Sequence, residues 1–428
     1  MSQQPLNILI SGGGIAGASL AFTLARQPGF KLQPNITLIE KAPAPRTTGQ
    51  AVDIRGPGVD VITKLGLEPA IKARHTSETG ISFLDSKGVT AAVFPATGDA
   101  KNQGASSEYE ILRGDLAGLL LDGVNDAKQK GAKVNIVYGE SIDNMEERED
   151  GTGVDVYFSN GKVSNQRFDV VIGADGIASK TRSLVFGKAD LKEHIKPSGL
   201  YIAFFSIPRI PEDDSLWRWC QIPPGLAMHL RPHCNQKTMG VYLTICHAKQ
   251  DYLPELEDVI HSDIATQKKY LRQRFQNIGW QSQRFLDGMD ATDDFYMSHW
   301  CRVVTPKYTK GHCVILGDAA FATMGIGTSL AMTGAYCIAG ELSKIESASQ
   351  APNALQKYED LVRPYIEKTQ NPMGAGVGMQ IANPQTAWGV WAFQMVLKIV
   401  TLLKIPQLMM RFFGGDGKEE WTVPDYGW

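Results

Sequence analysis

Residues Ile8–Ala25 read ILISGGGIAGASLAFTLA, which joins a short apolar run to a stretch of small residues through spaced glycines. The apolar run is typical of a buried parallel strand, and the small residues are typical of a closely packed helix. Gly12, Gly14 and Gly17 have the G-x-G-x-x-G spacing of a dinucleotide-binding turn. That turn needs a tight bend, a close approach to a pyrophosphate and close packing of helix on strand. Free N–H groups at the helix start, around Ala16, would face the phosphates.

An acidic residue closes the next apolar run. Ile36–Ile39 precedes Glu40, and a carboxylate at this strand end can accept hydrogen bonds from the ribose hydroxyls of an adenosine. It disfavours a 2′-phosphate, so the pattern favours FAD or NAD over NADP at this turn. Glu40 and the adjacent Lys41 are therefore candidate cofactor-binding residues. The alternative, a glycine-rich surface turn, does not explain Glu40.

Composition excludes several classes of protein. The 428 residues are enough for two domains, and 43% hydrophobic with 21% charged residues is ordinary for a globular chain. A net charge of −2 offers no electrostatic footprint for nucleic acid. The six cysteines form no C-x-x-C pair, and the histidines form no H-E-x-x-H pattern. His229 and His233 are four residues apart, but a strand followed by Pro232 places them badly for a shared metal. We therefore expect reduced thiols, no metal site and, since no signal peptide is evident, a cytoplasmic location.

One late segment is strongly apolar. Trp388–Phe413 is interrupted by Lys398, Lys404 and Arg411 and broken by Pro406. A membrane span needs about 20 mostly apolar residues without such charges, so no integral span is predicted. We expect an amphipathic helix packed across domains, with contact to a membrane surface as the alternative.

The texture of the chain changes twice. Ile81–Phe94 predicts a hairpin, and Asn160–Gly161 between Val154–Phe158 and Val163–Phe168 predicts a second one with a type I′ turn. Residues 191–302 carry alternating runs typical of an antiparallel sheet with one covered face. The α/β texture then returns with a buried strand at His312–Leu316 and a helix from about Ser329 to Ile345.

Two further motifs narrow the choice of cofactor. Asp169–Arg182 reads DVVIGADGIASKTR, and Gly311–Glu341 reads GHCVILGDAAFATMGIGTSLAMTGAYCIAGE. With the first glycine turn, these motifs resemble those of the class A FAD-dependent monooxygenases, the p-hydroxybenzoate hydroxylase-like group. Within that group, the tetracycline-inactivating and fungal secondary-metabolite enzymes are the most similar. The resemblance extends from Ile8 to about Glu341.

The resemblance implies an α/β architecture with a discontinuous first domain. We expect a Rossmann-like FAD-binding domain formed by residues 1–190 and 303–370. A mostly antiparallel β-sheet substrate domain, residues 191–302, would be inserted into it. Residues 371–428 would form a C-terminal helical segment.

The same resemblance assigns cofactor contacts. It places Asp318 near the ribityl chain or pyrophosphate, and Gly327 and Thr328 at a helix start that faces the flavin ring. Their alternative roles are those of a turn or a helix cap. Asp175 would lie near the pyrophosphate and affect the use of NAD(P)H, with Arg182 in a salt bridge.

Two more segments match the family. Arg113 opens an R-x-x-L helix whose arginine contacts the cofactor in the family, with a surface ion pair as the alternative. The segment Arg46–Asp53, RTTGQAVD, resembles the loop beneath the isoalloxazine. That likeness implies that Asp53 contacts FAD and that Arg46 meets the nicotinamide cofactor.

The function implied is an FAD-dependent, NAD(P)H-consuming monooxygenase. It would insert one oxygen atom from O2, through a C4a-hydroperoxyflavin, into a hydrophobic small molecule of aromatic or polycyclic type. No catalytic acid or base is named, because the cofactor carries the chemistry. Phe321–Ile326 lacks the proline of the family's loop and is shorter. A flavin oxidoreductase or oxidative cyclase without oxygen insertion, or a non-catalytic FAD carrier, therefore stays open. The sequence does not predict the oligomeric state.

Overall fold

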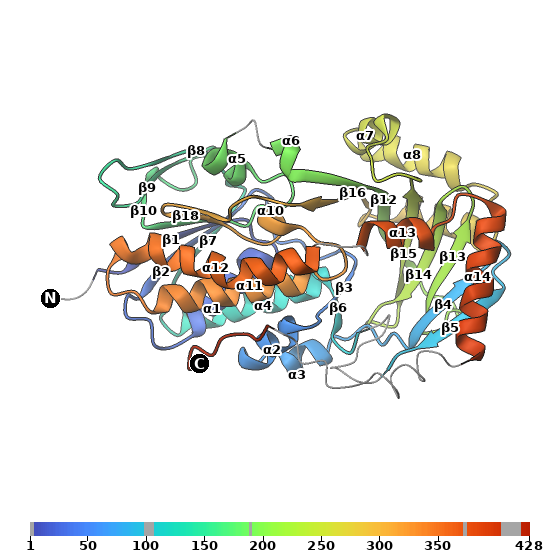
Figure 1. Ribbon diagram of the computed structural model, residues 1–428, viewed down its shortest axis with the longest axis horizontal. Helices are drawn as coiled ribbons and strands as arrows, with labels where there is room; N and C mark the ends of the chain where they lie inside the picture. The colour runs from blue at the N-terminus through green and yellow to red at the C-terminus, as the bar shows by residue number, and fades with distance from the viewer. Residues whose placement is uncertain (1–3, 98–106, 188–190, 371–374, 404–420) are drawn as a thin grey trace.

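The computed structural model describes residues 4–97, 107–187, 191–370, 375–403 and 421–428. A six-stranded sheet forms the centre of the domain on the left of Figure 1, and its strand order is β17-β18-β11-β1-β2-β7. All neighbours except β17 and β18 are parallel. The strands are β1 (Leu6–Ser11), β2 (Pro34–Glu40), β7 (Lys133–Tyr138), β11 (Val170–Gly173), β17 (Thr309–Lys310) and β18 (Cys313–Ile315).

This sheet is buried on both faces, which explains its nearly continuous apolar strands. Ile8 and Ile10 of β1 point into a core shared with the helices, while Leu9 points into a core shared with a three-stranded sheet. That small sheet contains β8 (Ile142–Glu147), β9 (Val154–Phe158) and β10 (Gln166–Phe168). The domain therefore has three layers, with the parallel sheet in the middle.

Helices cover the other face of the parallel sheet. Helix α1 packs against α11 and α4, and α11 also packs against α12 and α2. Figure 1 shows α11 and α12 side by side in front of the sheet. The helices of this domain are α1 (Ile15–Arg26), α2 (Pro57–Lys64), α3 (Glu68–Lys72), α4 (Arg113–Gln129), α5 (Lys180–Phe186), α10 (Asp318–Phe321), α11 (Gly327–Ser343) and α12 (Ala351–Gln370), with the 3-10 helix η1 (Ala348–Gln350) before α12.

A seven-stranded sheet forms the second body, on the right of Figure 1, in the order β16-β12-β15-β14-β13-β4-β5. One face packs on three helices, α7 (Pro254–Ile260), α8 (Ile264–Phe275) and α9 (Ser282–Ala291). The strands are β4 (Gly80–Leu84), β5 (Thr90–Pro95), β12 (Ile195–Pro208), β13 (Trp217–Ile222), β14 (Leu226–Pro232), β15 (Thr238–Cys246) and β16 (Tyr296–Val303), and the short helix α6 (Leu191–His194) precedes β12. This arrangement confirms the predicted α/β fold with a mostly antiparallel second sheet.

The predicted domain boundary is wrong at the first hairpin. The hairpin predicted over Ile81–Phe94 exists as β4 and β5, but β4 pairs in parallel with β13. Residues 80–95 therefore extend the seven-stranded sheet, although residues 1–190 were predicted to belong to the FAD-binding domain. Their alternating pattern predicted strands, but the partner strand lies more than a hundred residues away. Local pattern does not identify such a partner.

The turn around Asn160–Gly161 also differs from its prediction. Strand β10 starts only at Gln166, so Val163 lies in a longer loop. The buried carboxylate of Glu140 accepts hydrogen bonds from the backbone N–H groups of Ser141, Asn160 and Lys162, at 2.7–2.9 Å. These bonds hold the loop open where a two-residue turn was expected. They lower the pKa of Glu140 against the effect of its burial.

The C-terminal region is only partly helical. Helices α13 (Ala375–Ala382) and α14 (Ala387–Leu402) pack beside the seven-stranded sheet. Residues 421–428 have no helix and return to the first domain, where Trp421 stacks on Tyr365 and Trp428 on Phe30. The prediction of a helical segment over 371–428 is therefore wrong for this tail. The rest of the apolar stretch, from 404, lies outside the described residues. No described helix is long and apolar enough to cross a membrane.

Candidate functional site

The glycine turn has the geometry expected of it. Gly12 adopts a φ of +112°, and a Cβ there would collide with the carbonyl oxygen of Ala174. A Cβ on Gly17 would collide with the carbonyl oxygen of Gly12. Gly14, by contrast, faces open space, with no atom within 4 Å of an added Cβ. The turn therefore leaves room for a ligand beside Gly14.

Glu40 lies directly beside this turn. One carboxylate oxygen accepts a hydrogen bond from the N–H of Gly13, and the other from the N–H of Ala42, each at 2.8 Å. The side chain thereby fixes both the glycine turn and the end of β2. Lys41 is exposed next to it.

The motif that contains Gly317 and Asp318 lies next to the glycine turn. Gly317 has a φ of +63°, and an added Cβ would lie 2.8 Å from the Cβ of Ala16. This contact brings Asp318 next to the start of α1. Burial raises the pKa of Asp318, and the positive charge of Arg113 opposes that rise. Two residues 205 positions apart in the sequence thus lie near enough in the fold for the charge of one to affect the other.

Helix α11 starts beside Asp318. It begins at Gly327, two residues before the predicted start, and has no side-chain cap on its first N–H groups. The first-turn residue Ser329 accepts a hydrogen bond from the N–H of Arg55 at 2.8 Å. The N–H groups of Gly327 and Thr328 are therefore available to a ligand with negative charge.

The Asp175 side chain is used within its own loop. It accepts hydrogen bonds from Ser179 Oγ at 2.5 Å and from the N–H of Thr181 at 3.0 Å, next to the first turn of α5. Arg182 is buried and donates to the carbonyl oxygens of Ile177 and Ala319. It therefore ties this loop to the Asp318 motif rather than forming a salt bridge. A cofactor contact by Asp175 stays a prediction.

The segment Arg46–Asp53 joins the two bodies. The N–H of Gln50 donates to the Tyr296 hydroxyl at 3.3 Å, and the N–H of Ala51 donates to the Tyr242 hydroxyl at 3.1 Å. The Arg46 guanidinium lies 5.4 Å from the centre of the Tyr296 ring. Ala51–Asp53 forms β3, which pairs with β6 (Glu110–Leu112). The predicted cofactor loop therefore rests on the seven-stranded sheet.

Aromatic side chains cross the sheet in one line, here called the aromatic row. Each member lies opposite the next in the strand register, so all point to the same face. Ring centroids of neighbours are 4.6–6.0 Å apart. The row consists of Phe83, Trp219, His229, Tyr242, Phe204 and Tyr296.

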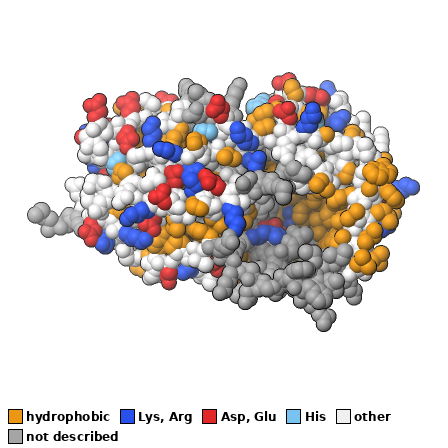
Figure 2. Space-filling model, in the orientation of Figure 1, with side chains coloured by type: hydrophobic (Ala, Val, Ile, Leu, Met, Phe, Trp, Pro, Cys, Tyr) orange, Lys and Arg blue, Asp and Glu red, His pale blue; other side chains and the backbone are white. Residues whose placement is uncertain are grey.

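The tryptophans in and around the seven-stranded sheet divide between its two faces. Trp217 stacks on Trp219 at 5.6 Å, and Trp300 lies 6.3 Å from Phe204, so these three belong to the face of the aromatic row. Trp280 packs on Phe285 in the opposite core. Figure 2 shows a hollow between the two bodies, with hydrophobic side chains on its right-hand wall.

His229 is the polar member of the aromatic row, and it is uncharged. Burial and the charge of Arg231 lower its pKa to about 3. The Trp217 indole N–H donates to Nδ1 of His229 at 3.1 Å, so the ring proton sits on Nε2, facing the Thr244 hydroxyl. The row therefore presents no charge from this side chain.

A buried ionic cluster, which the sequence reasoning missed, lies beside the row on the same face of the sheet, where the Arg231 guanidinium is 4.1 Å from the centre of the Trp217 ring. Arg231 of β14 donates to Glu78 at 2.9 Å and to Glu110 of β6 at 2.5 Å, and all three side chains are nearly inaccessible. Burial raises the pKa of Glu78 and, more strongly, that of Glu110. The signal was an arginine at the end of an apolar strand, since buried arginine requires partners.

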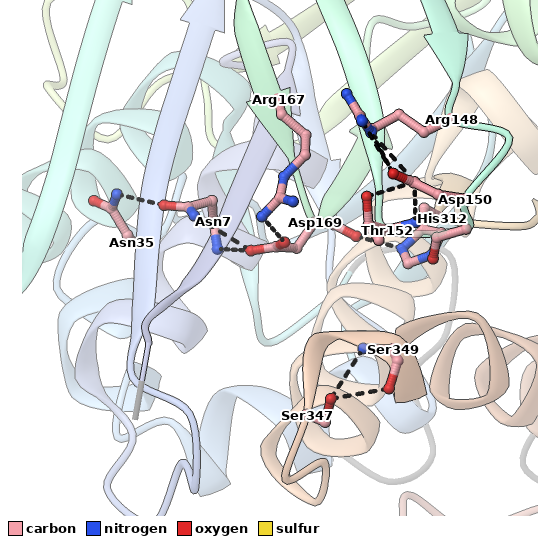
Figure 3. A network of polar contacts seen from close by, with 11 residues as sticks. Asn7, Asn35, Arg148, Asp150, Thr152, Arg167, Asp169, His312, Ser347 and Ser349 are labelled. Carbon is pink, nitrogen blue, oxygen red and sulfur yellow. Dashed lines mark hydrogen bonds and ion pairs between the residues drawn. The ribbon is translucent and has the colours of Figure 1, made fainter. Parts of the chain in front are cut away.

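A polar network lies at the amino ends of the parallel strands, opposite to the end that carries the glycine turn (Figure 3). Asp169 accepts a hydrogen bond from the N–H of Asn7 at 2.8 Å, and Asn7 accepts one from Asn35. His312 lies between the carbonyl oxygens of Asp169 and Gly151. These residues join the amino ends of β1, β2, β11 and β18, away from the glycine turn. No group of three potential metal ligands occurs in the described residues.

Comparisons with known proteins agree with this geometry. The sequence profile of the FAD binding domain family matches residues 6–371. The chain belongs to this family. Its relatives include FAD-dependent monooxygenase asL4 of Sarocladium schorii and flavin-dependent monooxygenase eupH of a Phoma species. Each is 30% identical, and the alignments cover 98% of both chains.

Solved structures share the whole architecture of this flavin-dependent monooxygenase. The tetracycline destructase Tet(51) is 26% identical with a TM-score of 0.73, and the match covers 100% of both chains. HpxO of Klebsiella pneumoniae, solved with FAD and uric acid, shares the fold at 18% identity, with a TM-score of 0.69 over 95% of this chain and 96% of that one.

The residues of the described chain fit FAD. Gly14 borders open space, α1 and α11 both lack a side-chain cap, and Asp53 Oδ1 is buried without a hydrogen-bond partner. A buried acceptor without a partner costs free energy unless a ligand supplies the donor. These features fit phosphates at the first turn and polar flavin groups beside Asp53 and α11.

Proposed function

We propose that this protein is an NAD(P)H-consuming monooxygenase that inserts one oxygen atom from O2 into a hydrophobic aromatic or polycyclic small molecule. The observation that carries the proposal is the contact between the aromatic row and the predicted cofactor loop, through Tyr242 and Tyr296. The substrate-facing rings and the cofactor-binding loop thus share hydrogen bonds. The similarity to the monooxygenase relatives and to the tetracycline destructase supports the same class of reaction.

Specific residues would hold the cofactor. The N–H groups at the start of α1, from Gly14 to Gly17 and including that of Ala16, would hold the pyrophosphate. Glu40, with Lys41 nearby, would hold the adenosine ribose. Asp318 and Arg113 would hold the ribityl region, and Asp53 the ring. When bound, FAD supplies hydride acceptance from NAD(P)H and activation of O2.

The chain supplies charge stabilisation where a reduced flavin would carry negative charge. The N–H groups of Gly327 and Thr328 lie at the positive end of α11. The guanidinium of Arg46, above Tyr296, would meet the nicotinamide cofactor from the exposed side. Neither role needs an acid or base from the protein.

The substrate face favours neutral, flat molecules. The aromatic row carries a neutral His229, and the charge of Arg231 is balanced by Glu78 and Glu110. Such a surface offers stacking area and a dry environment, with few polar groups to orient a ligand. A polycyclic aromatic compound matches these properties.

The direct test uses purified, FAD-loaded protein with NADH or NADPH and a panel of polycyclic phenols. We expect substrate-dependent oxidation of the reduced nicotinamide and one labelled oxygen atom in the product from ¹⁸O2. Product formation without label would contradict oxygen insertion and would favour the alternative of a flavin oxidoreductase or oxidative cyclase.

One observation keeps that alternative in view. The short loop from Phe321 to Ile326 lacks the proline of the family, and Met324 from this loop packs against the cluster of Phe204 and Trp300. The loop therefore occupies part of the aromatic face. Measuring hydrogen peroxide release by Met324→Ala and by the native protein would report whether this contact shields the oxygen chemistry.

A further inference from the structure

Helix α14 exposes a large apolar face. Side chains that are 37–80% accessible recur every three or four residues along it. Exposed large apolar side chains are normally scattered singly over a protein surface. Here they form one continuous stripe, which Figure 2 shows at the right-hand edge of the molecule, where Figure 1 places α14. The stripe consists of Trp388, Trp391, Met395, Val396, Ile399, Leu402 and Leu403.

The opposite face of α14 fixes its orientation. Phe393 and Leu397 pack against the cluster of Phe83 and Trp219, and Gln394 Nε2 donates to the carbonyl oxygen of Leu84 at 3.0 Å. The stripe therefore points away from the sheet. One apolar face of the helix, with Phe393 and Leu397, is already packed on the sheet. The exposed stripe is therefore a second apolar face of the same helix.

Charge within the stretch of sequence that contains the stripe has one sign. From Ala387 to Gly415 the sequence contains no Asp or Glu, whereas it contains Lys398, Lys404 and Arg411. Lys398 is exposed on α14 itself. The chain as a whole has a net charge of −2, so this region is a local cationic segment.

We propose that the exposed face of α14 docks on the surface of a membrane that contains anionic lipids. Tryptophan with leucine and isoleucine on one face, and cations nearby, is the composition of helices that lie in the lipid–water interface. A second copy of the chain is disfavoured, since a two-fold contact between identical stripes would bring the cationic segments together. The helix would lie on the membrane without crossing it.

Such docking has a consequence for the substrate face. The inner residues of α14 touch the aromatic row, and the outer residues would touch lipid. One helix would thus lie between the membrane interface and the aromatic row. The docking itself does not depend on the proposed oxygenase activity and is measured without turnover.

The test is sedimentation of the FAD-loaded full chain with vesicles of phosphatidylcholine alone and of phosphatidylcholine with phosphatidylglycerol. We expect binding to the anionic vesicles. Trp388→Ser with Trp391→Ser should weaken that binding by about tenfold or more, and Lys398→Gln by about fivefold. The matched control is Ile264→Ser, which removes an equally exposed apolar side chain from α8 and should leave binding unchanged.

A second measurement uses the native protein alone. Brominated lipid in the vesicles should quench part of the tryptophan fluorescence, because Trp388 and Trp391 would enter the interface. No sedimentation with anionic vesicles, or no quenching, would overturn the proposal. So would a native dimer that the two tryptophan substitutions convert to a monomer without any vesicle binding.

Discussion

Gly14 and Gly17 differ in what surrounds them, although the motif treats them alike. An alanine at Gly14 would meet no protein atom, whereas one at Gly17 would collide with the Gly12 carbonyl. We therefore expect Gly14→Ala to change the free energy of unfolding of the apo protein by less than about 0.5 kcal/mol. FAD binding should nevertheless weaken at least tenfold, measured by flavin fluorescence titration.

Gly17→Ala is the companion variant. It should lower both the stability of the apo protein and its FAD affinity, because the helix must move away from the strand. If Gly14→Ala bound FAD as tightly as the native protein, the pyrophosphate would not lie at this position.

Arg231 and its two carboxylates provide a test of buried charge. Arg231→Met would leave Glu78 and Glu110 without a cation, so we expect the free energy of unfolding to fall by about 3–5 kcal/mol. Urea denaturation of the apo protein measures this change. Arg148→Met, at an exposed ion pair, is the control and should leave stability unchanged.

The same cluster predicts a pH dependence. The pKa values of Glu78 and Glu110 are raised above the ordinary 4.5 by burial. Protonation therefore stabilises the fold, fully below pH 4.5 and less as the pH rises through the raised values. Glu78→Gln removes one of these groups, so its stability should fall less steeply than that of the native protein as the pH rises above 4.5. An equal pH slope in both proteins would contradict this expectation.

At the scale of elements, part of the C-terminal tail packs on α11. A Cβ on Gly340 of α11 would collide with the ring of Tyr426, whose hydroxyl donates to Glu341 at 3.0 Å. Gly340→Ala should therefore lower the melting temperature, although alanine favours a helix by about 1 kcal/mol. Gly118→Ala in α4, where nothing lies within 4 Å, should raise it.

A truncated chain isolates the cause. In a protein ending at residue 420, Gly340→Ala should become neutral or stabilising, since the ring that opposes it is gone. A loss of stability that persists after truncation would show that the tail contact is not responsible.

Elements were predicted well where the pattern was local. The strands β12 to β15 and the helices α1, α4 and α11 follow from apolar periodicity within one segment. The prediction of a two-residue turn around Asn160 was wrong because Glu140, twenty residues earlier, supplies the carboxylate that binds this loop. The prediction of a helix over 421–428 was wrong because the aromatic side chains of this tail pack on helices that are distant in the sequence.

At the scale of the whole molecule, two tyrosine hydroxyls connect the predicted cofactor loop to the seven-stranded sheet. Tyr242→Phe together with Tyr296→Phe removes the acceptors for the N–H groups of Ala51 and Gln50. We expect more reduced nicotinamide to be consumed per product molecule, with hydrogen peroxide released, because the loop would no longer be held against the sheet. Peroxide and product assays measure this ratio.

Tyr201→Phe is the matched control. Tyr201 lies on the opposite face of the same sheet and donates to Glu257 at 2.7 Å. Its loss should affect stability but leave the ratio of nicotinamide consumed to product unchanged. An equal rise in peroxide from both variants would indicate general loosening of the sheet.

The sequence by itself determined the nucleotide-binding turn, the Glu40 position and the class of fold, since these depend on glycine spacing and periodicity within a few tens of residues. The tertiary structure alone decided that β4 joins the seven-stranded sheet, that six aromatic side chains form one row, and that Arg231 contacts Glu78 and Glu110. Each of those contacts joins segments far apart in the chain. Strand register and burial select them only once both bodies have formed.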